Sequence, residues 1–375
     1  MKAVNLAHTL TLWLGSALLV GVSPSIRAAD GWPDQRDPRL KRGNQLVYRD
    51  KDASIKPVKT VADWRMRRAN TLEAMQAVMG PLPGAKKRCD LDVEIVEEAD
   101  CGSYVRRLIT YASEPGSRTP AYLLIPKNCL SGAAKAAAVL CLHPTENRIG
   151  HKVVVGLGGK PNRQYAQELA ERGFVTLAPS YPLLAKYQPD VLGLGHRSGT
   201  MKAIWDNIRG VDLLESLPFV KNGAIGAIGH SLGGHNSVYT AVFDERIKAI
   251  VSSCGLDAYT DYYGGNEKRW LPEQGWCQLR YMPKLAEYRG RLTEIPYDFH
   301  ELIAALAPRH VFISAPLKDS NFQWRSVDRI AEAAVEVYRL HGHPNRLRVE
   351  HPDCPHDFPT EMREIAYKMF EDVLK

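Results

Sequence analysis

The fold of this 375-residue chain is decided by the stretch AIGAIGHSLGG at residues 224–234. Its first half is apolar, as in a buried strand, and a helical pattern follows from residue 232. Between them, a Gly-x-Ser-x-Gly motif places Ser231 at the turn from strand to helix. Glycines two positions before and after Ser231 fit because a strained turn brings the chain too close for side chains. The stretch therefore predicts a serine hydroxyl raised above the edge of a sheet.

Outward from this turn, short apolar strands alternate with longer helical patterns. The expected strands cover residues 138–142, 174–178, 224–228, 247–252, 310–314 and 347–350. The expected helices cover residues 164–172, 201–217, 232–243, 327–341 and 360–374. This alternation is typical of a mostly parallel sheet with helices on both faces. We therefore expect an α/β fold whose catalytic domain spans residues 121–375.

Two segments are added to the alternating strands and helices, one before them and one within them. Residues 29–120 contain a polar stretch at 30–60, expected to be an exposed arm, and an amphipathic helix at 61–79. Lead-in strands follow at 93–96 and 104–111, and a third is expected at 121–125, at the start of the catalytic domain. Residues 257–302 interrupt the alternation and are rich in aromatic residues and glycine. A loop of this length is typical of a lid-like insertion, although it could also be a surface loop that packs its own aromatic residues.

The first 28 residues resemble a secretory signal peptide. Lys2 precedes an apolar run from Leu6 to Val22, and small residues follow up to Ala28, where we expect cleavage. An uncleaved N-terminal anchor is the alternative. We therefore expect an exported protein, periplasmic or extracellular, with no stable membrane insertion after cleavage. Export would permit a disulfide between Cys89 and Cys101 among the seven cysteines.

Composition narrows the class of protein. The chain is 45% hydrophobic and 24% charged, which is typical of a globular protein. Lys and Arg number 49 against 42 Asp and Glu, for a net charge of +7 without a long basic run. This balance argues against a dedicated nucleic-acid-binding protein. No cysteine or histidine spacing indicates a metal site, and nothing in the sequence requires a cofactor.

A serine nucleophile needs a base, and the base needs an acid that orients it. In this kind of fold the chain order is serine, acid, histidine. Asp319 follows the expected strand 310–314, and His356 follows the expected strand 347–350. Both positions lie at the carboxyl edge of the sheet, where open α/β folds place their sites. The sequence therefore predicts a catalytic triad of Ser231, Asp319 and His356.

Other residues compete for these roles. Asp257 follows the strand before the insertion and is the alternative acid. Asp357 adjoins the predicted base and is expected to pair locally instead. His343 and His351 lie near the last strand and are expected to be ordinary hydrogen-bonded or surface histidines.

The oxyanion hole should combine the N–H after the nucleophile with an N–H from an early strand–loop junction. The first donor is Leu232. The loop after strand 138–142 begins His143-Pro144, and because proline has no N–H, Thr145 or Glu146 must supply the second donor; we predict Thr145. Substrate-binding candidates are His230, beside the nucleophile, and the insertion residues Trp270 and Trp276.

The chain resembles the serine α/β-hydrolases, because Gly229–Gly233, Asp319 and His356 match the turn, acid and base of that superfamily. Within it, the chain is most similar to secreted dienelactone-hydrolase-like and acetylxylan-esterase-like proteins. The residues that carry this similarity are 143–144, 229–234, 307–310 and 356–359. The resemblance implies an α/β-hydrolase fold and a serine esterase acting on a small-molecule or carbohydrate ester.

Two positions depart from these relatives. Dienelactone hydrolases carry cysteine where this chain has Ser231. Acetylxylan esterases of this kind carry glutamine, and glucuronoyl esterases arginine, where this chain has Leu232. Two other functions share the fold: a serine peptidase related to prolyl oligopeptidase, and a binding protein that has lost catalysis. The segment before residue 121 is too short for the propeller of that peptidase group, and all three triad residue types are present, so we favour the esterase.

Overall fold

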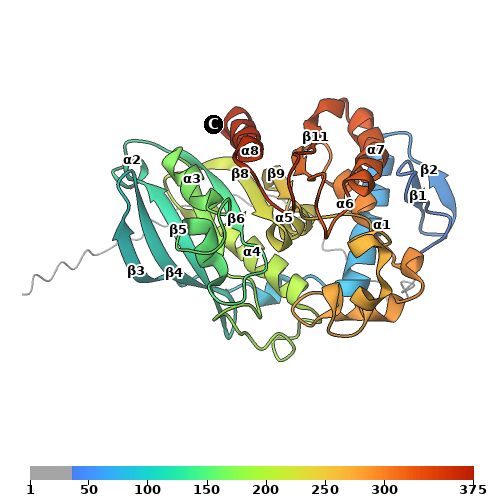
Figure 1. Cartoon of the computed structure of the whole chain (residues 1–375), viewed down its shortest axis with the longest axis horizontal. Coiled ribbons are helices and arrows are strands. Elements are labelled where there is room, and N and C mark those ends of the chain that lie inside the picture. The colour runs from blue at the N-terminus through green and yellow to red at the C-terminus, as the bar shows by residue number, and fades with distance from the viewer. Residues whose placement is uncertain (1–35) are drawn as a thin grey trace, which may run out of the picture.

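The computed structural model describes residues 36–375 (Figure 1). The predicted signal peptide, residues 1–28, lies outside the described residues. Within residues 36–375, no helix is both long enough and apolar enough to span a membrane.

A nine-stranded sheet crosses the described part of the chain in the order β11-β10-β9-β8-β6-β7-β5-β4-β3. Its strands are β3 (Glu94–Asp100), β4 (Tyr104–Glu114), β5 (Ser117–Pro126), β6 (Ala136–Leu142), β7 (Val175–Pro179), β8 (Val220–His230), β9 (Ile247–Ser253), β10 (His310–Ser314) and β11 (Leu347–Glu350). Strands β6 to β11 are parallel, whereas β3, β4 and β5 pair antiparallel. The predicted mostly parallel sheet is confirmed.

Helices cover both faces of this sheet. They are α1 (Val61–Met79), α2 (Lys127–Leu130), α3 (Tyr165–Glu171), α4 (Gly199–Ser216), α5 (Leu232–Phe243), α6 (Phe299–Ala305), α7 (Trp324–Leu340) and α8 (Thr360–Leu374). Side chains alternate between the faces along each strand: Leu140 of β6 joins a cluster with α4 and α5, whereas its neighbour Val139 joins one with α3 and α8. Both faces are therefore hydrophobic cores.

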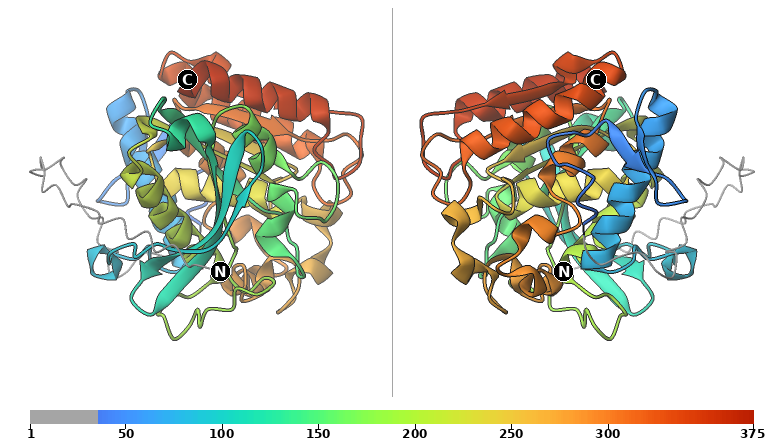
Figure 2. Two further views of the ribbon diagram at one scale, coloured as in Figure 1. Left: turned by 90° about the vertical axis from the view of Figure 1, so that its left-hand side faces the viewer. Right: turned by 90° about the vertical axis from the view of Figure 1, so that its right-hand side faces the viewer.

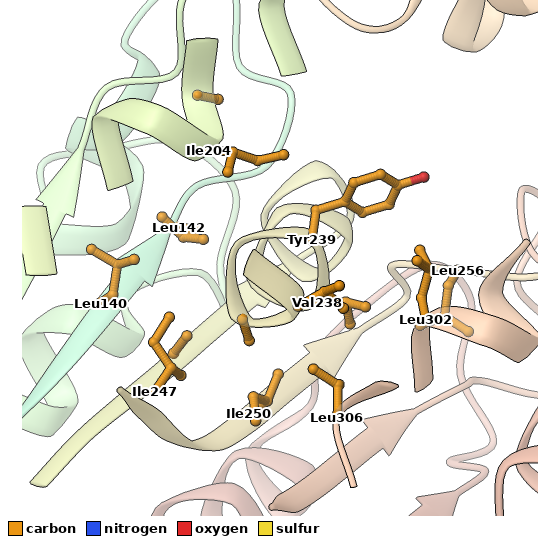
Figure 3. Packing of buried hydrophobic residues seen from close by; sticks show 14 of the residues in the cluster. Leu140, Leu142, Ile204, Val238, Tyr239, Ile247, Ile250, Leu256, Leu302 and Leu306 are labelled. Atoms are coloured by element: carbon orange, nitrogen blue, oxygen red, sulfur yellow. The ribbon is translucent and has the colours of Figure 1, made fainter. Parts of the chain in front are cut away.

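Helix α5, which follows the Ser231 turn, is buried along nearly its whole length. Figure 3 shows Val238 and Tyr239 of this helix packed near Leu140 of β6, Ile204 of α4 and Ile250 of β9. Burial on all sides holds the N-terminus of α5 at a fixed place above the carboxyl ends of the parallel strands.

The lead-in strands are part of the main sheet. Strand β5 pairs with β7, with Leu123 opposite Leu177, and β4 and β3 extend the sheet beyond it. Figure 2, left, looks onto this edge of the molecule. The expected boundary between residues 120 and 121 falls inside β5 (Ser117–Pro126).

The arm expected to be exposed at residues 30–60 is only partly exposed in its described part, because Leu40, Gln45 and Val58 are buried. Strands β1 (Val47–Arg49) and β2 (Ile55–Pro57) pair with each other, and β1 packs against α1. Arg42 forms an ion pair of 3.0 Å with Asp298, whose side chain is fully buried. The polar arm therefore packs on the rest of the molecule through ion pairs such as Arg42–Asp298 as well as through apolar contacts.

The insertion at 257–302 consists mainly of short 3-10 helices, drawn in orange at the lower right of Figure 1. These are Tyr262–Gly265, Glu267–Trp270, Gly275–Cys277, Pro283–Tyr288 and Leu292–Glu294. Helix α6 begins inside the predicted insertion, at Phe299. Cys89 and Cys101 are both free thiols, so the possible disulfide between them is not formed.

Candidate active site

Ser231 lies in the turn between β8 and α5, with φ 54° and ψ −121°. Its backbone N–H donates to the carbonyl of Ser253 at 2.8 Å, which ties the turn to β9. A Cβ atom added to Gly229 would lie 2.1 Å from the carbonyl carbon of Gly233, and one added to Gly233 would lie 1.9 Å from the carbonyl oxygen of Leu142. No real Cβ approaches other atoms so closely, so both glycines are required by the turn.

The predicted acid and base lie together at the carboxyl edge of the sheet. Nδ1 of His356 is 2.8 Å from Oδ2 of Asp319, and only 1% of the Asp319 side chain is exposed. The other oxygen of Asp319 accepts the backbone N–H groups of Asn321 at 2.7 Å and Phe322 at 3.3 Å. These bonds aim the carboxylate at the imidazole and hold the ring in one orientation.

The rival residues have other partners. Asp257 is buried and accepts the backbone N–H of Gln323 at 3.0 Å, just before helix α7, and burial raises its pKa well above the usual value. Asp357 pairs with Arg163, as expected of a locally paired carboxylate. His351 contacts Asp328 of α7 at 2.9 Å. The geometry favours Asp319 over Asp257 as the acid.

His230 does not line the substrate cavity, contrary to expectation. Its ring is 1% exposed, stands edge-on to the His356 ring at 4.9 Å between centroids and contacts the hydroxyl of Ser253 at 3.0 Å. Burial, followed by the charge of Arg163, lowers its pKa well below the usual value. His230 is therefore a neutral packing partner of His356.

Cys254 lies next to Asp319, the predicted acid. Its Sγ atom lies 3.2 Å from the carbonyl oxygen of Asp357, and burial and the charge of Asp319 raise its pKa well above the usual value. Cys254, Asp319 and His356 are the one group of metal-ligand type that residues 36–375 bring within 4.8 Å. The hydrogen bond between Asp319 and His356 already accounts for that proximity.

Both residues predicted to supply the oxyanion donors line one cavity together with Ser231. Leu232 is the first residue of α5, where the N–H has no partner within the helix and the helix dipole is positive. Thr145 lines the same cavity as Ser231 and Leu232, and its hydroxyl lies 2.9 Å from that of Tyr281. Glu146 is not among the residues that line this cavity.

The cavity beside Ser231 has a volume of about 350 Å³. Aromatic side chains form much of its wall: Tyr262, Tyr263, Trp276, Tyr281 and Phe322. Trp276 thus lies where we expected a substrate-binding residue. Trp270 does not, because its ring is fully buried against Tyr259 and Tyr262 in the core of the insertion.

Four further polar side chains line the cavity and were not among the predicted site residues. They are Arg269, Gln274, Gln278 and Asn321. Arg269, Gln274 and Gln278 come from the insertion, close in sequence to the predicted Trp270 and Trp276. Their position in this aromatic-rich segment is the sequence feature that could have indicated them. Phe322 was also missed, although its ring lies 5.9 Å from that of His356 and the residue follows Asp319 closely.

The chain is similar to several known proteins. The sequence profile of a family described as fungal glucuronyl esterase matches residues 189–342. YtaP of Bacillus subtilis, whose name records a hydrolase and no substrate, is 23% identical over 81% of this chain and 99% of its own length. The 4-O-methyl-glucuronoyl methylesterase of Hypocrea jecorina is 27% identical over 36% of this chain and 31% of its own length.

Solved structures extend the comparison to most of the chain. A glucuronoyl esterase from Solibacter usitatus superposes with a TM-score of 0.70 at 18% identity, covering 88% of this chain and 97% of that one. Acetyl xylan esterase 1 from Thermoanaerobacterium superposes with a TM-score of 0.52 at 16% identity, covering 77% and 90%. These similarities establish the α/β-hydrolase fold. The family profile and both of these solved structures carry the names of esterases.

Proposed function

We propose that this chain is an exported serine esterase that cleaves a carboxylic ester of a carbohydrate through an acyl-enzyme intermediate on Ser231. The observation that carries the proposal is the contact of 2.8 Å between Asp319 and His356 beside the Ser231 turn. A carboxylate that orients a histidine next to a strained serine is the arrangement that activates a hydroxyl for acyl transfer.

The proposed reaction has two halves. The Oγ atom of Ser231 attacks the acyl carbon while His356 takes the hydroxyl proton, and Asp319 stabilises the imidazolium that forms. The N–H groups of Leu232 and Thr145 bind the negative oxygen of the tetrahedral intermediate. The alcohol then leaves with the proton from His356, and a water molecule, activated by the same histidine, releases the acid.

The carbohydrate part of the proposal rests on the cavity. Its wall combines aromatic rings with amide side chains, as in Trp276 beside Gln274 and Gln278. Aromatic faces pack against the apolar faces of sugar rings, and amides exchange hydrogen bonds with hydroxyl groups. The family profile and the named esterases that superpose on the chain support the same substrate class.

The test is hydrolysis of a panel of esters by the mature protein: short 4-nitrophenyl esters, acetylated xylose oligomers and methyl esters of glucuronic acid. We expect release of acid from at least one sugar ester by the wild type. We expect none above background from S231A, and unchanged rates from S131A, which alters an exposed serine outside the site. Equal rates in wild type and S231A would contradict the proposal.

Export has its own test. The mature chain, recovered from outside the cytoplasm of an expressing bacterium, should have the mass of a polypeptide that begins at Ala29. Recovery of the full-length chain in the membrane fraction would favour an uncleaved anchor instead.

A further inference from the structure

The cavity beside Ser231 holds a single formal charge. Among the described residues that line it, Arg269 alone has an ionised side chain; the others are aromatic, amide, hydroxyl or apolar. A cation in a cavity whose other lining residues are neutral gives the cavity a positive potential, because no carboxylate lines the same wall. The cavity is therefore built to attract negative charge.

Arg269 is free of ion pairs within the described part of the chain. None of the salt bridges within residues 36–375 includes it, and Asp261, a carboxylate of the same insertion, pairs with Arg329 at 2.6 Å instead. The guanidinium of Arg269 stacks on the ring of Tyr263, 3.9 Å from its centroid. This contact holds the half-buried cation against the cavity wall and leaves its N–H donors available.

A second cation adds to the positive potential. Arg280 lies near the ring of Tyr281, at 5.1 Å from its centroid, and donates to the amide oxygen of Asn147 at 2.9 Å. Tyr281 lines the cavity. Because Asn147 is neutral, the charge of Arg280 is not cancelled by this hydrogen bond.

Neither the predicted acid Asp319 nor its rival Asp257 forms an ion pair with Arg269. Asp319 is 1% exposed and is committed to His356 and to two backbone N–H groups. Asp257 is buried, and burial raises its pKa, which favours the uncharged form. An arginine held beside a nucleophile without a carboxylate of its own indicates a carboxylate in the substrate, which guanidinium can bind through two parallel hydrogen bonds.

We propose that Arg269 binds a second, ionised carboxylate of the substrate, distinct from the ester that is cleaved. This inference rests on the proposed function and makes it more specific: the preferred substrates are esters within acidic saccharides that keep a free carboxylate near the scissile bond. A neutral ester of the same shape would leave Arg269 without a partner.

The experiment compares matched esters that differ in one charge. The first pair is 4-carboxyphenyl acetate and 4-carbamoylphenyl acetate, which differ on the alcohol side. The second pair is the mono-4-nitrophenyl ester of adipic acid and 4-nitrophenyl hexanoate, which differ on the acyl side. The measured quantity is the ratio of kcat/KM for the anionic ester to that for the neutral ester, after subtraction of the rate without enzyme.

Three variants separate recognition by Arg269 from general charge effects. R269Q removes the cation and keeps a polar side chain of similar length, whereas R269K keeps the charge. K268Q is the matched control, because Lys268 is exposed, adjacent in sequence and absent from the cavity wall. Comparing each ratio with that of the wild type cancels the intrinsic reactivity of the esters.

We expect the ratio for at least one pair to fall about tenfold in R269Q, as for the loss of a charged hydrogen bond, with a smaller fall in R269K and none in K268Q. We also expect the wild-type preference to shrink as the salt concentration rises from about 0.05 M to about 0.5 M, because salt screens exposed charges. The same ratios in wild type and R269Q for both pairs would overturn this inference alone. Failure of the wild type to cleave any ester would instead overturn the proposed function.

Discussion

Nδ1 of His356 lies 2.8 Å from Oδ2 of Asp319 at the carboxyl edge of the sheet. The bond joins the loop after β10 to the loop before α8, so residues separated widely in the sequence meet beside Ser231. It also distinguishes two candidate acids, because Asp257 bonds to the backbone of Gln323 instead.

The first prediction concerns this choice of acid. D319N should lower kcat by a factor on the order of 10³ to 10⁴, because an amide does not hold the histidine in the tautomer that accepts the serine proton. D257N, which alters a carboxyl group of similar burial outside the hydrogen bond, should keep a rate close to that of the wild type. Ester hydrolysis under saturating substrate measures both, and a larger loss in D257N than in D319N would reverse the assignment.

The second prediction concerns the turn. In G233A the new methyl group would meet the carbonyl oxygen of Leu142 at 1.9 Å, so the turn must shift. We expect loss of activity and a fall of at least about 1–3 kcal/mol in the free energy of unfolding, as in overpacked cores. G84A is the control, since no atom lies within 4 Å of the position of the added Cβ. Urea unfolding checks both; equal stability and activity of G233A and wild type would contradict the account of the turn.

The third prediction is a pH dependence of stability. Nδ1 of His143 donates to the carbonyl of Pro144 and Nε2 accepts the N–H of Tyr181, so the ring is neutral. Burial lowers the pKa of His143 to about 4, from 6.5. Because the unfolded chain binds the proton more readily, stability is complete above pH 6.5 and is lost as the pH falls towards 4. This histidine should contribute about 2 kcal/mol of that loss between pH 7 and pH 5.

H143Q is the variant that isolates this contribution from those of the other buried histidines. Its free energy of unfolding should be lower than that of the wild type at pH 7, and the gap should narrow at pH 5. Urea titrations at the two pH values measure the gap, and a gap that stays constant or widens on acidification would contradict the neutral, buried state of His143.

The fourth prediction concerns the docked arm. Glu301 is buried and forms ion pairs with Arg36 at 3.0 Å and Arg67 at 3.3 Å. Burial raises the pKa of Glu301, but the charges of the two arginines outweigh it and keep the pKa below the usual value. E301Q leaves both cations without a counter-charge and should reduce the free energy of unfolding by about 3–5 kcal/mol. E332Q, at an exposed site on α7, should have little effect; equal losses in both variants would contradict the role of this network.

Much of the fold could be predicted from the sequence because its signals are local. The helices Val61–Met79, Leu232–Phe243 and Thr360–Leu374 have the predicted bounds, since apolar spacing and flanking glycines or prolines act over a few residues. The glycines around Ser231 and the order of the three site residues depend only on strand–turn–helix geometry. Asp319 and His356 follow from that order.

The remaining features depend on distant contacts. The arm looked exposed because Arg36 and Arg42 are charged, and their partners Glu301 and Asp298 lie far away in the sequence. Trp270 and Trp276 have the same chemistry and neighbouring positions, yet Trp270 is buried and Trp276 lines the cavity. Which face of a 3-10 segment points to the core is decided by packing, which a single sequence does not reveal.

The most direct test of the central claim, that Ser231 is an activated nucleophile, is labelling with a fluorophosphonate followed by mass spectrometry of the digested protein. We predict one adduct, on the peptide that contains Ser231, with no adduct in S231A or after heat denaturation. We also predict that labelling abolishes ester hydrolysis in proportion to the labelled fraction. An adduct on another residue, or full hydrolysis by a protein whose Ser231 is completely labelled, would contradict the account.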